Sequence, residues 1–448
     1  MSRHAERLPM HNTPQSPPRI ARGGRVFYGW WLAIAGVLNG TLQSLFLGFG
    51  FSAFFLPIQE ELSASRAALS LAFSFSQLEA GFTGPLNAYL IDRFGPRKVM
   101  TVGYLFFAAG FMLLSRAPSL IVFYAAYVFT AIGAGMSGHL PVSITVARWF
   151  IRKRSMAVGI SQVGDGLGGM LVPLLALSIA TFGWRNTALA AGPILLIIGL
   201  PLASLFRSKP EDSGLLPDGE RPQPQQATLP GEPEVTASLS YWDEPLITAW
   251  GALRMPAFWL IAGAHSLTLF MVTAVNIHQI PALVATGLDY HTAALILSLT
   301  TGCTVAGRLI FGFLGDRFNP QRALAGCFLV QAVAVLFLAH AQNLAMALVF
   351  SVLYGVSFGG RGPLLIGIRS DFFGRRSFAT ILGVSQTILM AGTITGPVFA
   401  GWIYDVTQSY TIAFWIMAAI NVFSMALIVA AKKPTYASQK TSKADAGI

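Results

Sequence analysis

An arginine in the middle of an apolar, glycine-rich stretch is the residue in this sequence that points most directly to chemistry. Arg308 lies in the segment 307–318, which ends on the pair Asp316-Arg317. An ionisable side chain among so many apolar residues is costly, so such residues usually serve a function. A guanidinium presents paired N–H donors that match a carboxylate, and the neighbouring glycines leave space for an anion. The pattern predicts an anion-binding site at Arg308.

A second arginine lies in a similar setting. Arg361 follows Gly359 and Gly360 and precedes Gly362. These small neighbours leave room for a ligand or for another helix. Arg361 is therefore a candidate substrate-binding residue, although it could instead extend its charge to the nearby end of its helix.

Two carboxyl groups and a histidine are candidates for proton exchange. Glu79 is flanked by Leu and Ala and followed by Gly and Phe, and Asp165 lies within a run of glycines. Either carboxyl group could hold a proton or neutralise an arginine, and Glu79 could also lie near an aqueous vestibule. His139 could bind a ligand or relay a proton, or it could be a core histidine with satisfied hydrogen bonds. A contact between Asp165 and Arg308 is also plausible.

Polar residues near the end of another apolar stretch suggest a further contribution to binding. Asn276 and His278 precede Pro281 in the stretch 256–285. They could contact a ligand or line a vestibule, and both readings remain open.

The amino-acid composition indicates the kind of structural element in which these candidate residues lie. Of the 448 residues, 54% are hydrophobic and 11% are charged, and the mean hydropathy is +0.60. Soluble proteins contain about 25% charged residues. Stretches of about 20 apolar residues are long enough to span a membrane, and a dozen occur here: 28–55, 66–90, 99–115, 119–147, 155–181, 187–206, 256–285, 291–314, 322–340, 344–368, 378–404 and 410–431. The chain is therefore expected to be an all-α integral membrane protein.

The polar segments divide the chain into two equal parts. We predict a cytoplasmic tail over 1–27, a six-helix bundle over 28–206, a cytoplasmic linker over 207–255, a second six-helix bundle over 256–431 and a cytoplasmic tail over 432–448. The linker is rich in Pro, Glu, Asp and Gln, as mobile polar segments are. Cys303 and Cys327 both fall within expected helices, so neither a disulfide framework nor a cysteine metal site is expected.

The net charge of +11 follows from membrane topology and does not indicate a nucleic-acid partner. If the tails, the linker and the even-numbered connections share one side, that side holds 25 of the 30 Lys and Arg residues, and the other side holds 3. Lys and Arg are retained on the cytoplasmic side. Both termini are therefore expected to face the cytoplasm, and a bacterial inner membrane is the expected location.

An internal repeat connects the two halves. When the sequence is aligned with itself at a shift of half its length, Asp92-Arg93 aligns with Asp316-Arg317. Such a repeat occurs in proteins built from duplicated bundles. Both pairs belong to turns that resemble the loop motif Gly-x-Leu-x-Asp-Arg-x-Gly of the major facilitator superfamily. The resemblance implies two pseudo-symmetric six-helix bundles and twelve transmembrane helices. It also implies that these four residues help to hold one closed arrangement of the halves.

Within that superfamily, two segments resemble the oxalate/formate antiporters and the monocarboxylate transporters. The segments are the Gly-Arg-x-x-x-Gly-x-x-x-Asp-Arg pattern that begins at Gly307 and the Ala-Arg-Trp-Phe segment at 147–150. The resemblance implies that Arg308 binds a substrate carboxylate. The chain departs from the monocarboxylate transporters at Thr304, where they carry an aspartate. It also lacks the helix-eleven lysine of the oxalate exchanger.

The expected function is secondary active transport of a small organic anion, with a monocarboxylate as the leading candidate. Alternating access would be driven by proton coupling (symport) or by anion exchange (antiport). A proton-coupled exporter of drugs or metabolites is the alternative. An enzyme is not expected, because no clustered nucleophile or metal set is visible. The expected partners are the lipid bilayer, the anion and protons, with no cofactor and a monomer as the functional unit.

Overall fold

The structure, a computed structural model, describes residues 27–150, 154–208, 210, 218, 249–314, 319–373 and 378–433. Within these ranges the regular secondary structure is helical. The first half contains α1 (Tyr28–Phe46), α2 (Gly50–Glu61), α3 (Arg66–Phe94), α4 (Pro96–Leu114), α5 (Leu120–Ser137), α6 (His139–Trp149), α7 (Arg154–Ser161), α8 (Gly164–Met170) and α9 (Val172–Leu205). The second half contains α10 (Ala249–Leu253), α11 (Pro256–Ala285), α12 (Tyr290–Leu314), α13 (Pro320–Ala339), α14 (Leu344–Phe373), α15 (Phe378–Thr407) and α16 (Thr411–Ala430).

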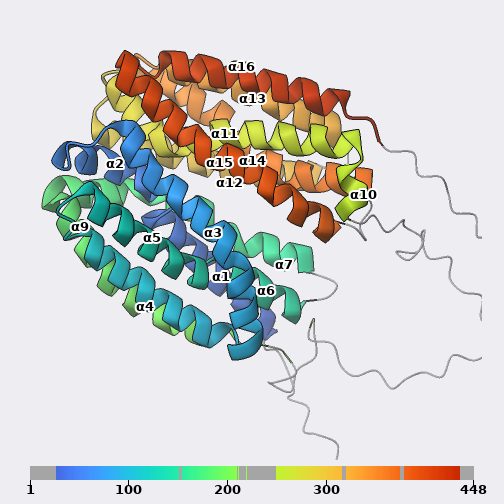
Figure 1. Cartoon of the computed structure of the whole chain (residues 1–448), viewed down its shortest axis with the longest axis horizontal. Coiled ribbons are helices and arrows are strands. Elements are labelled where there is room, and N and C mark those ends of the chain that lie inside the picture. Colours follow the sequence, from blue (N-terminus) through green and yellow to red (C-terminus); the bar gives the residue numbers. More distant parts are fainter. Residues whose placement is uncertain are drawn as a thin grey trace, which may run out of the picture.

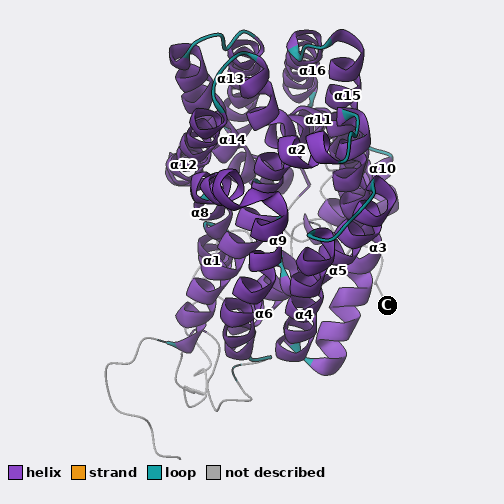
Figure 2. Cartoon of the chain, turned by 90° about the vertical axis from the view of Figure 1, so that its left-hand side faces the viewer, coloured by secondary structure: helices purple, strands orange, loops and turns teal. Residues whose placement is uncertain are grey.

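The two halves of the sequence form two helical bundles. Figure 1 shows α1–α9 on one side of the molecule and α10–α16 on the other. The bundles meet where α3 packs against α15, where α2 packs against α11, and where α8 and α9 pack against α12. The turned view in Figure 2 likewise places α8 beside α12. Any site between the bundles is therefore lined from both halves of the chain.

Ten helical segments of the described residues are long and apolar enough to cross a membrane. One of them, Met156–Leu205, contains 50 residues. Its long helix α9 turns at Gly183, where φ is +78°, a conformation that glycine adopts without steric cost. This segment therefore has length for two crossings. α3, with 29 residues, is long enough to span as well but is not among the ten because its residues are more polar.

Three of the apolar stretches that we expected to form single helices are interrupted. The first breaks between α1 and α2 near Gly48, and the stretch 119–147 breaks at Gly138. The stretch 155–181 is divided among α7, α8 and the start of α9. A Cβ atom on Gly50 would lie only 1.7 Å from the carbonyl oxygen of Leu45, so the first break requires glycine there.

The glycines of α8 allow this short helix to pack closely on both sides. A Cβ atom at Gly164 would lie 2.0 Å from the carbonyl oxygen of Val37 in α1. On the other side, a Cβ atom at Gly166 would lie 2.1 Å from a methyl group of Val305 in α12. Small residues permit such close approaches between membrane helices. The glycine-rich segment therefore packs against the helix that carries Arg308.

Candidate functional site

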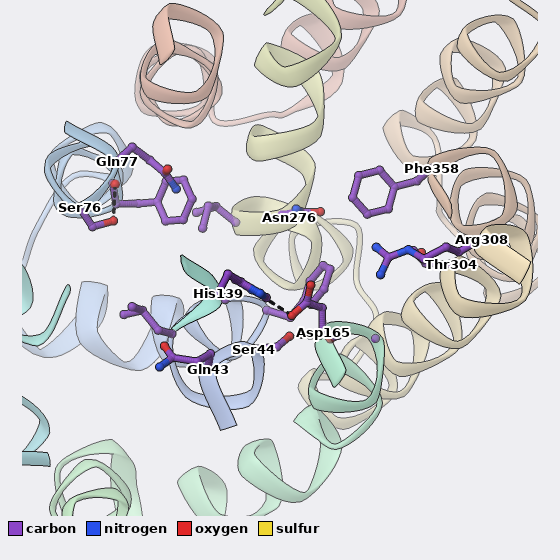
Figure 3. Close-up of a pocket in the computed structure, with 16 residues that line it drawn as sticks. Gln43, Ser44, Ser76, Gln77, His139, Asp165, Asn276, Thr304, Arg308 and Phe358 are labelled. Atoms are coloured by element: carbon purple, nitrogen blue, oxygen red, sulfur yellow. Dashed lines mark hydrogen bonds and ion pairs between the residues drawn. The ribbon is translucent and has the colours of Figure 1, made fainter. Parts of the chain in front are cut away.

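A cavity of about 340 Å³ lies between the two bundles. Figure 3 shows that its walls come from both halves of the chain. Those from the first half are Gln43, Ser44, Leu47, Gly48, Phe49, Phe73, Ser76, Gln77, His139, Asp165 and Gly166, and those from the second half are Asn276, Ile277, Thr304, Arg308 and Phe358. A cavity lined from both bundles can change its access when the bundles move relative to each other.

A histidine and a carboxylate form the polar centre of the first half's wall. His139 Nε2 lies 3.1 Å from Asp165 Oδ1, and the two side chains are 53% and 28% exposed. The break at Gly138 makes His139 the first residue of α6, and the close packing of α8 on α1 brings Asp165 to the same wall. Ser44 donates a hydrogen bond to the carbonyl oxygen of Asp165 at 2.6 Å. The pair can hold a proton at the edge of the cavity.

Arg308 supplies the positive charge of the opposite wall. Its Nη1 donates a hydrogen bond of 2.8 Å to the carbonyl oxygen of Gln162, across the interface between the halves. In Figure 3 its guanidinium extends from α12 toward the His139–Asp165 pair. Asp165 thus pairs with His139 and Arg308 with a main-chain oxygen, so the Asp165–Arg308 contact that the sequence suggested does not form in this conformation. The remaining N–H groups of Arg308 can bind an anion in the cavity.

The rest of the cavity wall is amphipathic. Phe49, Phe73 and Phe358 provide aromatic surface, while Gln77 and Asn276 provide amide groups. Such a lining suits a ligand with an apolar body and one charged group. Sequence alone does not distinguish these three phenylalanines from packing residues, because aromatic side chains in apolar helices usually belong to the core.

The cavity brings together three of the five predicted substrate-binding residues, namely Arg308, His139 and Asn276. The other two, His278 and Arg361, are buried and do not line it. Of the two carboxyl groups proposed for proton exchange, Asp165 lines the cavity. Glu79 belongs to α3, but its side chain lies outside the described residues.

A second polar cluster joins the halves at the N-terminal end of α3. Asp405 of α15 accepts hydrogen bonds from the backbone N–H groups of Arg66 and Ala67, each at 2.9 Å. These are the first two residues of α3, and the N-cap Ser65 accepts a third bond, from Ala68. A carboxylate at this position satisfies helix donors and interacts favourably with the helix dipole. One half of the protein therefore caps a helix of the other.

Aromatic residues and His278 surround this contact. The Arg66 guanidinium lies 3.4 Å from the centre of the Tyr404 ring and donates to the Tyr410 hydroxyl at 2.8 Å. His278 contacts the same hydroxyl at 2.9 Å and Ser70 of α3 at 3.1 Å. We refer to Arg66, Ser70, His278, Asp405 and Tyr410 as the interdomain cluster. His278 thus belongs to a contact between the halves.

The turn between α3 and α4, which contains Asp92 and Arg93, lies at the other end of α3. Asp92 forms an ion pair with Arg148 of α6, within the same half. Arg93 donates a hydrogen bond of 2.7 Å to the hydroxyl of Tyr89. Asp316 and Arg317, the equivalent pair of the second half, lie outside the described residues. The role of all four residues in holding a closed state remains a prediction.

The family of the chain follows from its match to known proteins. A sequence model described as Major Facilitator Superfamily matches residues 32–284 and 264–447. The chain belongs to this superfamily. It is therefore a multi-pass membrane transporter and not an enzyme, as the sequence analysis expected.

Curated relatives include several monocarboxylate transporters. The chain is 25% identical over 419 residues to monocarboxylate transporter 12-B of Danio rerio, covering 89% of this chain and 88% of that protein. It is 26% identical over 426 residues to human monocarboxylate transporter 11, covering 91% and 84%. The distant similarity to monocarboxylate transporters expected from the segment around Arg308 is therefore confirmed.

Solved structures confirm the fold. A bacterial homolog of the human lysosomal transporter Spinster, in an inward-facing and occupied conformation, superposes with a TM-score of 0.70 at 16% identity, covering 91% of this chain and 97% of that one. The nucleoside transporter NupG gives a TM-score of 0.70 at 12% identity, covering 89% and 99%. At these identities the similarity concerns the fold alone. The expected two-bundle major facilitator fold is correct.

Proposed function

We propose that this transporter carries a small organic anion, with a monocarboxylate as its substrate, through the cavity between the two bundles. The observation that supports this proposal is the Arg308 guanidinium in the cavity wall, beside aromatic surface and opposite a titratable pair. A planar donor fork suits a carboxylate, and the aromatic side chains suit its apolar body. The similarity to monocarboxylate transporters supports the same substrate class.

Alternating access would expose this cavity to each side of the membrane in turn. The interdomain cluster would act as the gate at the end where α3 begins. The turn with Arg93, Arg97 and Lys98 lies at the opposite end, and its basic residues support a cytoplasmic location for that end. In this conformation the gate is closed on the non-cytoplasmic side, so the substrate would exchange with the cytoplasm.

Proton coupling would use the His139–Asp165 pair. A bound carboxylate would add negative charge beside this pair, and opposite charges attract, so the complex would favour uptake of a proton. Anion and proton binding would then assist each other, which favours symport of the two.

Uptake into proteoliposomes tests the proposed function. The purified protein would be offered labelled monocarboxylates with small, branched or aromatic bodies, each with its uncharged amide as a matched control. We expect uptake of one or more carboxylates, counterflow with unlabelled substrate, and no uptake of the corresponding amides. Equal uptake of an acid and its amide, or uptake of cations alone, would contradict the proposal.

A further inference from the structure

Three buried side chains inside the second bundle have polar atoms without partners. Arg361 of α14 is 8% exposed, and its Nη1 has no hydrogen-bond partner. The hydroxyl group of Tyr354, two turns earlier on the same face of α14, also has none. Both amide atoms of the fully buried Gln331 in α13 are likewise unpaired. A buried polar group without a partner destabilises the fold, and a charged group does so more strongly.

These groups belong to one region of the bundle interior. Arg361 interacts electrostatically with Tyr354 and with Cys327 of α13. Gln331 follows Cys327 by one helical turn, so it lies on the same face of α13. α13 and α14 pack against each other over much of their length. The unpaired atoms thus gather between these two helices.

The chemistry of the region has an excess of donors and of positive charge. Arg361, Tyr354 and Gln331 all offer N–H or O–H donors, whereas acceptor capacity comes from the Tyr354 hydroxyl and the Gln331 carbonyl. Among the described residues, the electrostatic neighbours of Arg361 are Tyr354, Cys327, His265, Arg308 and Arg369, and none of these is a carboxylate. A buried arginine needs a counter-charge. An anion would provide both the charge and the missing acceptor.

An aromatic wall separates this region from the transport cavity. The Phe358 ring lines the cavity, while the Arg361 guanidinium lies 5.0 Å from its centre and is not part of the cavity wall. Tyr354 stacks on the same ring at 5.9 Å with an interplanar angle of 14°. The region therefore lies behind Phe358 and is distinct from the site at Arg308.

We propose that Arg361 and Tyr354, with Gln331 nearby, form an internal site for a small monovalent anion, such as chloride or bromide, that is separate from the transported substrate. The anion neutralises Arg361 and links α13 to α14. It is small because the surrounding side chains are buried. The proposal does not depend on which substrate the cavity carries.

Thermal unfolding of the purified protein in bromide tests this site. At constant ionic strength, bromide would replace isethionate, a larger anion without a carboxylate group. We expect the wild-type Tm to rise and to saturate with bromide. Tyr354→Phe keeps the ring and removes one donor to the anion, so the midpoint concentration should rise about tenfold or more. Arg361→Gln should abolish the saturable rise.

Two comparisons make the result specific. Arg308→Gln removes the cavity arginine and should keep a saturable bromide response, and bromide should appear between Arg361 and Tyr354 as an anomalous scattering peak in crystals. Equal responses of the wild type and Tyr354→Phe, or a response lost in Arg308→Gln, would overturn the proposal. Identical Tm values in bromide and isethionate would mean that water alone fills the region, which would also overturn it.

Discussion

At the scale of single residues, the shape of the Arg308 side chain matters as well as its charge. An ammonium group is a point charge without the planar fork of a guanidinium, so Arg308→Lys should lose most transport and Arg308→Ala all of it. A hydrogen bond to a charged group contributes about 1.5–3 kcal/mol, so loss of one should weaken substrate binding by roughly ten- to a hundredfold. The measurement is substrate binding to purified, monodisperse variants.

The exposed Arg322 at the start of α13 provides the matched control. Arg322→Lys should bind substrate as the wild type does. Wild-type substrate affinity in Arg308→Ala would contradict the assignment of Arg308 as the residue that binds the substrate carboxylate.

The His139–Asp165 pair leads to a second prediction at this scale. Asp165→Asn and His139→Gln retain polarity and similar size but remove the titratable groups. We expect either change to make uptake insensitive to an imposed pH gradient while counterflow of substrate continues. Glu79→Gln provides the comparison, because Glu79 was an equal candidate from sequence. If only Glu79→Gln removes the pH dependence, the proton site lies on α3.

The sequence predicted the structural role of some residues and not of others. Arg308 could be found because a lone charge in an apolar stretch is conspicuous without any knowledge of neighbours. The contacts of His278 and Asp405 with α3 could not be predicted, since more than 200 residues of chain separate each of them from its partner in α3. In the sequence, His278 suggested ligand contact or the lining of a vestibule, and Asp405 reads as an ordinary polar residue near a helix end.

At the scale of elements, the capping of α3 by Asp405 should control the balance between conformations. Asp405→Asn removes the charge that interacts with the helix N-terminus and weakens one of the two backbone bonds. The closed gate should lose about 1–2 kcal/mol, which shifts the equilibrium about five- to thirtyfold. A cysteine introduced at the buried interface position by Ser52→Cys, with Cys303 and Cys327 replaced by serine, reports the opening through its rate of alkylation from outside.

The exposed Asp289, in the turn before α12, supplies a control of the same chemistry. Asp289→Asn should leave the alkylation rate unchanged. If Asp405→Asn also leaves it unchanged, the interdomain cluster does not act as a gate.

Sequence periodicity predicted the long helices of the second half closely, because their apolar stretches are uninterrupted and bounded by polar turns. It missed the breaks at Gly48 and Gly138, because apolar residues continue on both sides of each glycine. Whether such a glycine bends a helix or only permits close packing depends on what packs against it. The breaks matter for function, since the second one presents His139 at the start of a helix.

At the scale of the whole molecule, the distribution of Lys and Arg leads to a prediction about topology. Both termini and the linker over 207–255 should face the cytoplasm. A phosphatase that folds only in the periplasm should be inactive when fused after Ile448 and active when inserted after Arg116. A fusion after Ile448 that is active in the periplasm would reverse the proposed orientation.

The bond between Arg308 and the Gln162 carbonyl has a consequence for the transport cycle as a whole. The guanidinium has an internal partner in the other half of the protein, at 2.8 Å. The carbonyl satisfies one N–H donor but leaves the positive charge in place, and the bond must break when the two halves move relative to each other. We therefore expect efflux into a substrate-free medium to be slower than one-for-one exchange of labelled substrate. Return of the empty carrier would then limit the rate of net transport.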